Sequence, residues 1–388
     1  MGEKDMGEVE DLLADLIAIP STSGEEREIA QFVTEYLGER VGLQPSTDEM
    51  HNVVMEFESG REGLTLLLTA HLDTVQPAPG WTYEPHEPTI VDDRIYGLGA
   101  SDSKGTIAPM ITAIRRCLEE HTSSMRGKLI LALTSQEENP VGELDGLRYL
   151  LKRGLKADLA LFGNGFCQNG VPFLTIGHNG YVRYEISVRG RGSHSSTPHL
   201  GINAIEKAAD LIRILKEVRM PSQEILGETI PATMNVGVIR GGTQPNVVPS
   251  ECTVIGDRRT LPMERSEKVI DGLQAVLKRR AEQDSELKYE AAFEKLHDAY
   301  LLPEDGKIVG LLGRIMEQTY GFKPKLRYDR PYYDADYLGG ARIATVMVGS
   351  AVPGTPHQPD EYNLLENVRS LERIYTAFIR ELLSREQL

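Results

Sequence analysis

The sequence predicts an α/β protein with a mostly parallel catalytic sheet flanked by helices and a smaller α+β domain inserted into it. Strand and helix patterns alternate over residues 8–163, as expected for parallel strands joined by crossover helices. Near Gly177 the pattern changes to half-exposed strands with alternating apolar and polar residues, which is typical of an antiparallel sheet. The first pattern returns near Leu296, so both ends of the chain are expected to build one domain.

The chain length supports this division, because 388 residues exceed what one hydrophobic core usually spans. The catalytic domain is expected to consist of residues 1–178 and 295–388. Residues 179–294 are expected to form the inserted lid and dimerisation domain.

The elements of the first part follow from its hydrophobic periodicity. Apolar residues at helical spacing predict helices over 8–19, 25–37, 106–121 and 144–154. Pro20 ends the first of these helices, and the segment "STSGEE" offers caps for the second. Short apolar runs predict strands over 51–57, 64–71, 127–138 and 157–163.

The insert is predicted to be a strand–helix–strand–strand–helix–strand module. Its strands are expected over 181–196, 232–242, 251–260 and 286–293, and its helices over 202–218 and 264–283. The strand "YVRYEISVRG" is expected at a sheet edge, where it would pair with its twin in a homodimer. The rest of the chain, after the insert, is predicted to form a helix over 305–319, a strand over 344–350 and a helix over 364–385.

The composition excludes several classes of partner. A formal net charge of -16 argues against nucleic acid, whose phosphates would be repelled. The three cysteines, Cys117, Cys167 and Cys252, form neither a disulfide framework nor a CxxC metal site. No apolar run approaches the roughly 18 residues of a membrane span, and the N-terminus lacks a signal-peptide pattern. We therefore expect a soluble, cytoplasmic protein without a membrane partner.

Ionisable residues interrupt the hydrophobic pattern at several strand ends and in a glycine-rich loop. They are His71 and Asp73, Asp102, Glu137 and Glu138, and His357. In a parallel sheet the carboxyl ends of the strands meet at one edge, where ligands bind. A mixture of imidazole and carboxylate suits a divalent metal, so the sequence predicts a metal site there.

Each of these residues also has a plain structural explanation when taken alone. A histidine at a strand end is usually hydrogen-bonded, and a Glu-Glu pair is usually a solvated face. The loop "GLGASDSKG" has neither the spacing of a nucleotide loop nor a GxSxG elbow. The prediction therefore depends on their occurring together at strand ends of one domain.

Motifs in a fixed order resemble the co-catalytic zinc aminoacylase and carboxypeptidase family, and the resemblance covers nearly the whole chain. That family includes acetylornithine deacetylase, succinyl-diaminopimelate desuccinylase, glutamate carboxypeptidases and carnosinase-like dipeptidases. The motifs are "TAHLDTVQP", "YGLGASDSKG", "SQEENPVGELDG", "GRGSHSSTPHLGINAI", "GGTQPNVVPSECTVIGDRR" and "HQPDEY".

The resemblance implies a role for each matching residue. The implied metal ligands are His71, Asp102, Glu138 and His357, with Asp102 bridging two ions. Glu137 would be the general base that activates water, and Asp73 would orient His71. His194 would polarise the scissile carbonyl across a dimer, and Asn246 and Arg259 would hold the substrate's carboxylate. Zn²⁺ is the implied cofactor, at one or two ions per chain, with Co²⁺ or Mn²⁺ as alternatives.

Asn164 is a departure from the family pattern, which has an acidic metal ligand after the strand "ADLALFG". An amide oxygen can bind a metal but brings no charge, so the metal site beside His71 is expected to be weak. The resemblance implies a deacylase or exopeptidase that cleaves an amide next to a free carboxylate. The alternative is a catalytically silent relative that binds a small molecule and has a degraded second metal site.

Overall fold

The computed structural model describes residues 7–139 and 144–387. Two compact units can be distinguished. Unit 1 takes its residues from Met1–Gly177, Leu302–Arg327 and Tyr337–Leu388, and unit 2 from His178–Leu301 and Tyr328–Asp336. The predicted domain boundaries, 1–178, 179–294 and 295–388, stay a prediction. A domain is a segment that folds on its own, and a division into compact units does not test this.

Unit 1 is built on a sheet whose central strands are parallel. The strand order is β1-β2-β6-β3-β7-β21-β10. The parallel strands are β6 (Lys128–Thr134), β3 (Thr65–His71), β7 (Leu159–Phe162) and β21 (Ala344–Met347). Antiparallel strands follow on either side: β1 (Ser46–Thr47), β2 (Val53–Glu58) and β10 (Leu174–His178).

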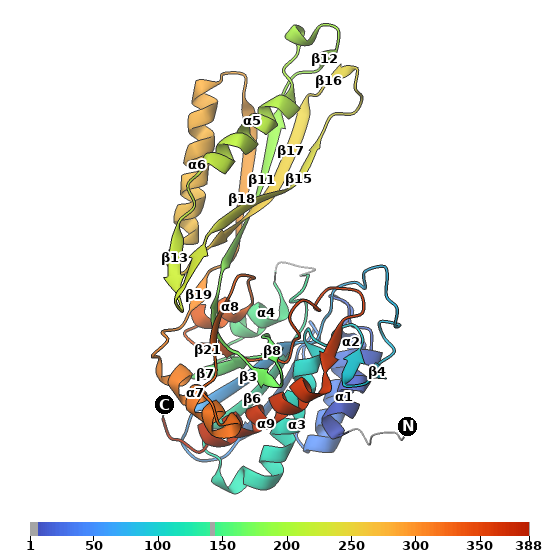
Figure 1. Cartoon of the computed structure of the whole chain (residues 1–388), viewed down its shortest axis with the longest axis vertical. Coiled ribbons are helices and arrows are strands. Elements are labelled where there is room, and N and C mark those ends of the chain that lie inside the picture. Colours follow the sequence, from blue (N-terminus) through green and yellow to red (C-terminus); the bar gives the residue numbers. More distant parts are fainter. Residues whose placement is uncertain (1–6, 140–143, 388) are drawn as a thin grey trace. The chain divides into compact units, whose positions relative to one another are not determined.

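Helices flank this sheet, and the predicted α/β class is confirmed. They are α1 (Glu8–Ala18), α2 (Arg27–Tyr36), α3 (Lys104–His121), α4 (Gly146–Lys152), α7 (Lys307–Tyr320) and α9 (Leu365–Leu382). Figure 1 shows α3 and α9 lying against each other, and α1 also packs against α3. Strand β3 is almost wholly buried, as expected for a strand covered on both faces.

Smaller elements complete unit 1. A three-stranded sheet consists of β4 (Thr89–Val91), β5 (Arg94–Tyr96) and β22 (Tyr362–Leu364). Strands β8 (Cys167–Gln168) and β9 (Val171–Pro172) form a hairpin. Strand β20 (Leu326–Asp329) and helix α8 (Ala335–Gly340), in the C-terminal third of the chain, each have residues in both units.

Unit 2 contains a four-stranded antiparallel sheet with the order β15-β17-β11-β18. The strands are β15 (Thr233–Gly241), β17 (Glu251–Thr260), β11 (Gly180–Arg189) and β18 (Lys288–His297). Helices α5 (Ala204–Glu217) and α6 (Ser266–Gln283) pack on it around Tyr184, Leu211 and Leu277 (Figure 1). Short pairs are β12 (Ser193–His194) with β16 (Val247–Val248), and β13 (Ser222–Ile225) with β14 (Glu228–Pro231).

The predicted edge strand is wrong. The segment "YVRYEISVRG" belongs to β11, which pairs with β17 on one side and β18 on the other. The edges of this sheet are β15 and β18. Alternation of apolar and polar residues marks a strand with one buried face, but it does not distinguish a central strand from an edge. The predicted strand over 181–196 is also interrupted, since β12 is separate from β11.

Within residues 7–139 and 144–387, the structure has no helix long and apolar enough to cross a membrane.

Candidate metal centre

His71 is the last residue of β3 and is buried. Its Nδ1 lies 2.9 Å from the backbone oxygen of Asp73 and 3.6 Å from the Asp73 carboxylate. A carbonyl oxygen only accepts, so Nδ1 carries the proton in this hydrogen bond. Nε2 is then the atom available to a metal, and it lies 3.0 Å from Asp102 Oδ1.

Asp73 connects His71 to the Glu137–Glu138 loop. Its buried carboxylate accepts hydrogen bonds from the backbone N–H groups of Glu137 (3.1 Å) and Glu138 (3.0 Å), and from the Ser23 hydroxyl (2.6 Å). Burial alone would raise the pKa of Asp73, but His71 and these donors hold that pKa below its ordinary value. Asp73 therefore stays ionised and fixes the positions of two neighbouring segments.

Asp102 lies between two histidines. Its Oδ1 is 3.0 Å from His71 Nε2, and its Oδ2 is 3.7 Å from His357 Nε2. Because its two oxygens face different imidazoles, this carboxylate has the arrangement that a bridging metal ligand needs.

A buried carboxylate holds the backbone at Asp102. Glu361 Oε1 accepts hydrogen bonds from the N–H groups of Ser101 (2.8 Å) and Asp102 (3.0 Å). Burial raises the pKa of Glu361 to about 7. The sequence reasoning missed this residue, although it stands four residues after His357 in the quoted "HQPDEY" segment.

Glu137 and Glu138 follow the end of β6. Gln136, just before them, has a φ of 60°, a left-handed conformation that is uncommon for a residue other than glycine. Glu26 Oε1 accepts hydrogen bonds from the N–H groups of Gln136 (3.0 Å) and Gly24 (2.9 Å) and so supports this turn. Glu26 was also missed, because the "STSGEE" segment was interpreted only as helix caps.

His357 closes the cluster from a loop near the C-terminus. Its Nε2 lies 2.7 Å from Glu138 Oε1, and its side chain is 46% exposed. The residue has a φ of 63°, a left-handed conformation that is uncommon for a residue other than glycine.

The structure thus brings together the residues that the sequence singled out. Two groups have potential ligand atoms within 4.8 Å of one another: His71, Glu137 and Glu138, and Asp102, Glu138 and His357. Glu138 belongs to both groups. Glu137, predicted as a base rather than a ligand, also lies within ligand distance in this arrangement.

The electrostatics of the cluster favour a cation. Burial and the carboxylates of Glu138 and Asp102, opposed by His71, raise the pKa of Glu137 to about 8. The hydrogen bond to Glu138 raises the pKa of His357 to about 9. Burial lowers the pKa of His71, but Glu137, Asp102 and Asp73 raise that pKa well above its ordinary value. A nearby positive charge stabilises carboxylates that lie this close together. The carboxylate oxygens and the imidazole nitrogens of the histidines are suitable ligands for a divalent metal.

Asn164 follows the end of β7, the strand beside β3. The neighbouring Gly163 N–H donates to the Thr69 oxygen at 2.7 Å, which places this loop beside the end of β3. The Asn164 side chain is buried, and among the described residues its Oδ1 has no hydrogen-bond partner. A buried oxygen without a donor is unfavourable, and a cation would satisfy it.

The remaining predicted residues, His194, Asn246 and Arg259, lie in unit 2. His194 is exposed in β12, and its Nδ1 lies 2.7 Å from Ser196 Oγ. Asn246 is also exposed. It lies near His194 in the fold, because its backbone oxygen accepts a hydrogen bond from the N–H of Ser195 at 3.0 Å.

Arg259 lies at the other end of the unit 2 sheet. It is opposite Tyr181 at the start of β11, whereas β12 follows the end of that strand at Arg189. A strand rises about 3.3 Å per residue, so the span from Tyr181 to Arg189 corresponds to roughly 26 Å. Asn246 and Arg259 of one chain therefore do not reach the same carboxylate. They can meet on one substrate only if they come from different subunits.

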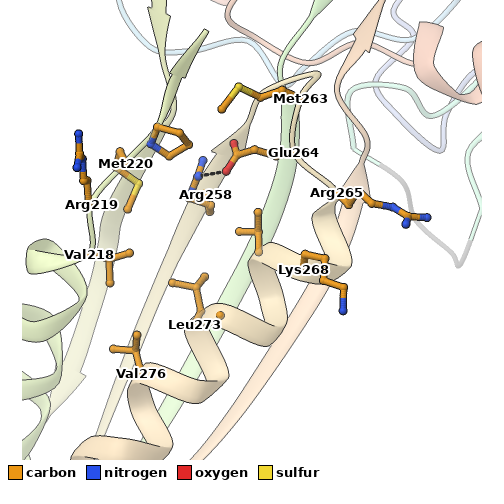
Figure 2. Close-up of a pocket in the computed structure, with 13 residues that line it drawn as sticks. Val218, Arg219, Met220, Arg258, Met263, Glu264, Arg265, Lys268, Leu273 and Val276 are labelled. Carbon is orange, nitrogen blue, oxygen red and sulfur yellow. Dashed lines mark hydrogen bonds and ion pairs between the residues drawn. The ribbon is translucent and has the colours of Figure 1, made fainter.

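A hollow of about 600 Å³ in unit 2 distinguishes Arg258 from Arg259. Figure 2 shows Arg258 lining this hollow beside apolar residues of α6, with its guanidinium joined to Glu264. Arg258 is buried and Glu264 is partly buried, with Arg258 Nη2 at 2.6 Å from Glu264 Oε1. Successive side chains of a strand point to opposite faces, so Arg259 lies on the other face. The Arg258 guanidinium is therefore already paired within the fold. This favours Arg259 as the arginine that binds a ligand.

Comparisons with known proteins give concordant results. Residues 176–285 match the family model described as a peptidase dimerisation domain, and residues 52–162 match the one described as peptidase family M28. A succinyl-diaminopimelate desuccinylase from Thioalkalivibrio sulfidiphilus is 26% identical over 390 residues, covering 97% of this chain and 100% of the relative.

Two solved structures share the fold over almost their whole length. An M20 family metallo-carboxypeptidase from Sulfolobus solfataricus has a TM-score of 0.81 at 20% identity, covering 98% of this chain and 100% of its own. Aminopeptidase PepT from Bacillus cereus has a TM-score of 0.79 at 22% identity, covering 97% and 98%.

Proposed function

The chain belongs to the family of metal-dependent aminoacylases and carboxypeptidases that includes succinyl-diaminopimelate desuccinylase, and we propose that it cleaves an amide bond next to a free carboxylate. It is a metal-dependent amide hydrolase that acts on N-acyl amino acids or peptides. The observation that carries the proposal is the cluster of His71, Asp102, Glu137, Glu138 and His357 at the carboxyl edge of the unit 1 sheet.

The enzyme uses a divalent metal, and the residues of the cluster fit one. We assign His71, Asp102, Glu138 and His357 as its ligands, with Asp102 shared and Asn164 as a further, neutral ligand. We propose zinc as the natural ion, with cobalt or manganese as substitutes, because all three accept imidazole and carboxylate together. When bound, such an ion supplies a Lewis acid that polarises the scissile carbonyl and acidifies water.

Each residue of the chain then has a distinct task. Glu137 removes a proton from the attacking water and returns it to the leaving amine. Asp73 holds the His71 imidazole and the loop that carries Glu137. We assign to His194 the stabilisation of the negative charge that develops on the carbonyl oxygen. The presence of Glu137 within the cluster argues against a catalytically silent relative, since such a protein has no use for the base.

We propose that the substrate's carboxylate is held by Arg259 and Asn246. A guanidinium forms paired, charge-assisted hydrogen bonds with a carboxylate, which suits N-acyl amino acids and short peptides with a free C-terminus. The net charge of -16 makes nucleic acid an unsuitable partner. The three buried free cysteines suit a reducing compartment, and we propose the cytoplasm.

The positions of these residues support a homodimer. Because Arg259 lies at the opposite end of β11 from His194 and Asn246, one chain does not supply all three to a single substrate. We propose that the Arg259 and Asn246 that contact one substrate come from different subunits, and that His194 acts on the substrate bound by the partner subunit.

Heterodimers that combine Glu137→Gln with His194→Ala test this arrangement. Tagging the two chains differently allows the mixed dimer to be purified. If His194 acts across the interface, the chain with Glu137 intact receives His194 from its partner, and the mixed dimer keeps about half of wild-type activity. If His194 acts within its own chain, both sites are defective, and the mixed dimer will be as inactive as either homodimer.

Because Asn164 is neutral, we expect the two metal ions to be bound with unequal affinity. Its neutral amide lacks the charge of a carboxylate ligand, so the ion beside His71 loses several kcal/mol of attraction before solvent compensates. The group of Asp102, Glu138 and His357 keeps its charges. We expect one tightly held ion per chain and a second that dialyses away.

Metal analysis after dialysis checks this expectation, and Asn164→Asp is the informative variant. It should raise the occupancy of the weak site, whereas Asn169→Asp, in the exposed turn between β8 and β9, should leave it unchanged. Two equally tight ions in the unmodified protein would refute the expectation.

A hydrolysis screen tests the proposed function as a whole. The panel should contain N-acyl amino acids, dipeptides and their C-terminal amides, each assayed with zinc, cobalt and manganese. We expect metal-dependent release of amine from carboxylate-bearing members and little from the amides. Equal hydrolysis of acids and amides would contradict the proposed carboxylate recognition while leaving the hydrolase assignment intact.

A further inference from the structure

We propose that Tyr332, together with Tyr181, is a positioning residue that fixes the Arg259 guanidinium for a substrate's carboxylate. The inference deepens the proposed function and rests on it. Tyr332 belongs to the segment Tyr328–Asp336, which unit 2 takes from the C-terminal third of the chain. This role was not predictable from the sequence, because the segment "RPYYDADY" matches none of the motifs quoted above.

The aromatic rings contact the guanidinium directly. The guanidinium carbon of Arg259 lies 4.4 Å from the ring centroid of Tyr181 and 5.2 Å from that of Tyr332. The two rings are themselves stacked, with centroids 5.0 Å apart and an interplanar angle of 7°. Cation–π attraction acts within about 6 Å, so both rings stabilise the cation.

The stack continues to His297, which anchors Tyr332. The ring of His297, at the end of β18, stacks on Tyr332 with centroids 4.3 Å apart. His297 Nδ1 lies 3.0 Å from Asp336 Oδ1, and Asp336 Oδ2 accepts a hydrogen bond from Asp298 N–H at 2.9 Å. Tyr332 therefore contacts a supported imidazole as well as Tyr181 and the Arg259 guanidinium, and these contacts restrict its orientation.

The Arg259 guanidinium is held in place, but not all of its N–H groups have hydrogen-bond partners in the part of the chain that the structure describes. Asp257 Oδ2 accepts from Arg259 Nε at 3.0 Å, which fixes one edge of the group. Its Nη1 is buried and has no hydrogen-bond partner among the described residues. A buried donor without an acceptor is unfavourable, and a ligand's carboxylate would satisfy it.

The neighbouring arginine shows that this state is particular to Arg259. Arg258 donates to the Glu264 carboxylate and to the backbone oxygen of Arg259, so it is satisfied within the fold. Of the two adjacent arginines, the one with an unpartnered nitrogen is the one that lies against two tyrosines. Preorganising a rotamer-rich side chain in this way removes part of the entropic cost of binding.

The test uses the full-length protein and the best carboxylate substrate from the screen. The variants are Tyr332→Leu, Tyr332→Phe, Arg259→Ala and the double variant Tyr332→Leu/Arg259→Ala. Tyr289→Leu is the matched control, because Tyr289 is a half-buried tyrosine of the same unit at the other end of the sheet. For each variant we would measure KM, kcat, and the ratio of kcat/KM between the substrate and its C-terminal amide.

We expect Tyr332→Leu to raise KM about tenfold with little change in kcat, and to weaken the preference for the acid over the amide. Tyr332→Phe should retain wild-type values, since the ring is kept, and Tyr289→Leu should leave KM unchanged. Once Arg259 is replaced by alanine, Tyr332→Leu should have no further effect on KM, because the two side chains act together.

Three results would overturn the inference, and they can be told apart. If Arg259→Ala removes the preference for the acid but Tyr332→Leu leaves KM and the preference unchanged, Tyr332 does not position Arg259. If Arg259→Ala leaves the preference unchanged, the proposed carboxylate contact itself is wrong, and the inference fails with it. An equal rise in KM from Tyr332→Leu in both backgrounds would show an effect that does not pass through Arg259.

Discussion

Replacing Glu137 with glutamine is expected to lower kcat by about 10²–10⁴-fold, the usual contribution of a general base. The amide keeps the shape of the side chain but cannot take a proton from water. The fold should be preserved, because the turn is held through the backbone N–H groups of Gln136, Glu137 and Glu138. Steady-state kinetics on the best substrate measure the effect.

Metal content distinguishes a base from a ligand at this position. Glu137 lies within ligand distance of His71 and Glu138, so loss of a ligand would also reduce activity. A base predicts unchanged metal content in Glu137→Gln. Glu58→Gln is a suitable control, because Glu58 is exposed and pairs with the opposite end of β6. Near-wild-type turnover in Glu137→Gln would refute its role, and parallel losses of metal and activity would make it a ligand.

Asp102→Asn is expected to have a similar or larger effect, because Asp102 faces both histidines. The substitution keeps the side chain's size but removes the charge that two sites would share. Losing several kcal/mol of charge stabilisation corresponds to about a thousandfold or more in kcat/KM. Bound metal after dialysis should fall below one ion per chain.

Asp92→Asn provides the control for this variant. Asp92 is exposed in the turn between β4 and β5 at a φ of 57°, a conformation that asparagine also tolerates. It should retain both metal and activity. If Asp102→Asn keeps its metal and loses only turnover, Asp102 acts on the reaction rather than as a shared ligand.

The unit 1 fold was predictable because its strands have a strong local signal. The run ending at His71 is buried on both faces, so a continuous apolar segment followed by polar residues marked both the strand and its functional end. The same reasoning located Glu137 and Glu138 after β6. The rule that polar residues at strand ends share one edge of a parallel sheet then predicted the cluster.

The misplaced edge strand shows what local patterns leave open. The alternation in β11 has the same form whether that strand has one neighbour or two, and its partners are set by long-range pairing with β17 and β18. The same limit applies to Glu26 and Glu361. Each supports a loop by accepting hydrogen bonds from backbone N–H groups of a segment far away in the sequence. Every residue except proline has such an N–H group, so the residue types do not show which ones are bonded.

Tyr332 is a further example of long-range placement. Nothing between Arg259 and Tyr332 in the sequence indicates that the ring stacks beside the guanidinium. By contrast, the resemblance to the family implied Arg259 from its place in a motif, and the geometry is consistent with that assignment, since the neighbouring Arg258 is paired with Glu264.

Anomalous diffraction from crystals grown with cobalt or zinc would test the central claim most directly. The claim is that Asp102, Glu138 and His357, with His71 beside them, form the metal site of a hydrolase. Data collected on either side of the metal's absorption edge should give a strong peak within coordination distance of Asp102, Glu138 and His357, and a weaker one beside His71 and Asn164. A fully metal-loaded, active enzyme with no anomalous peak among these residues would contradict the account.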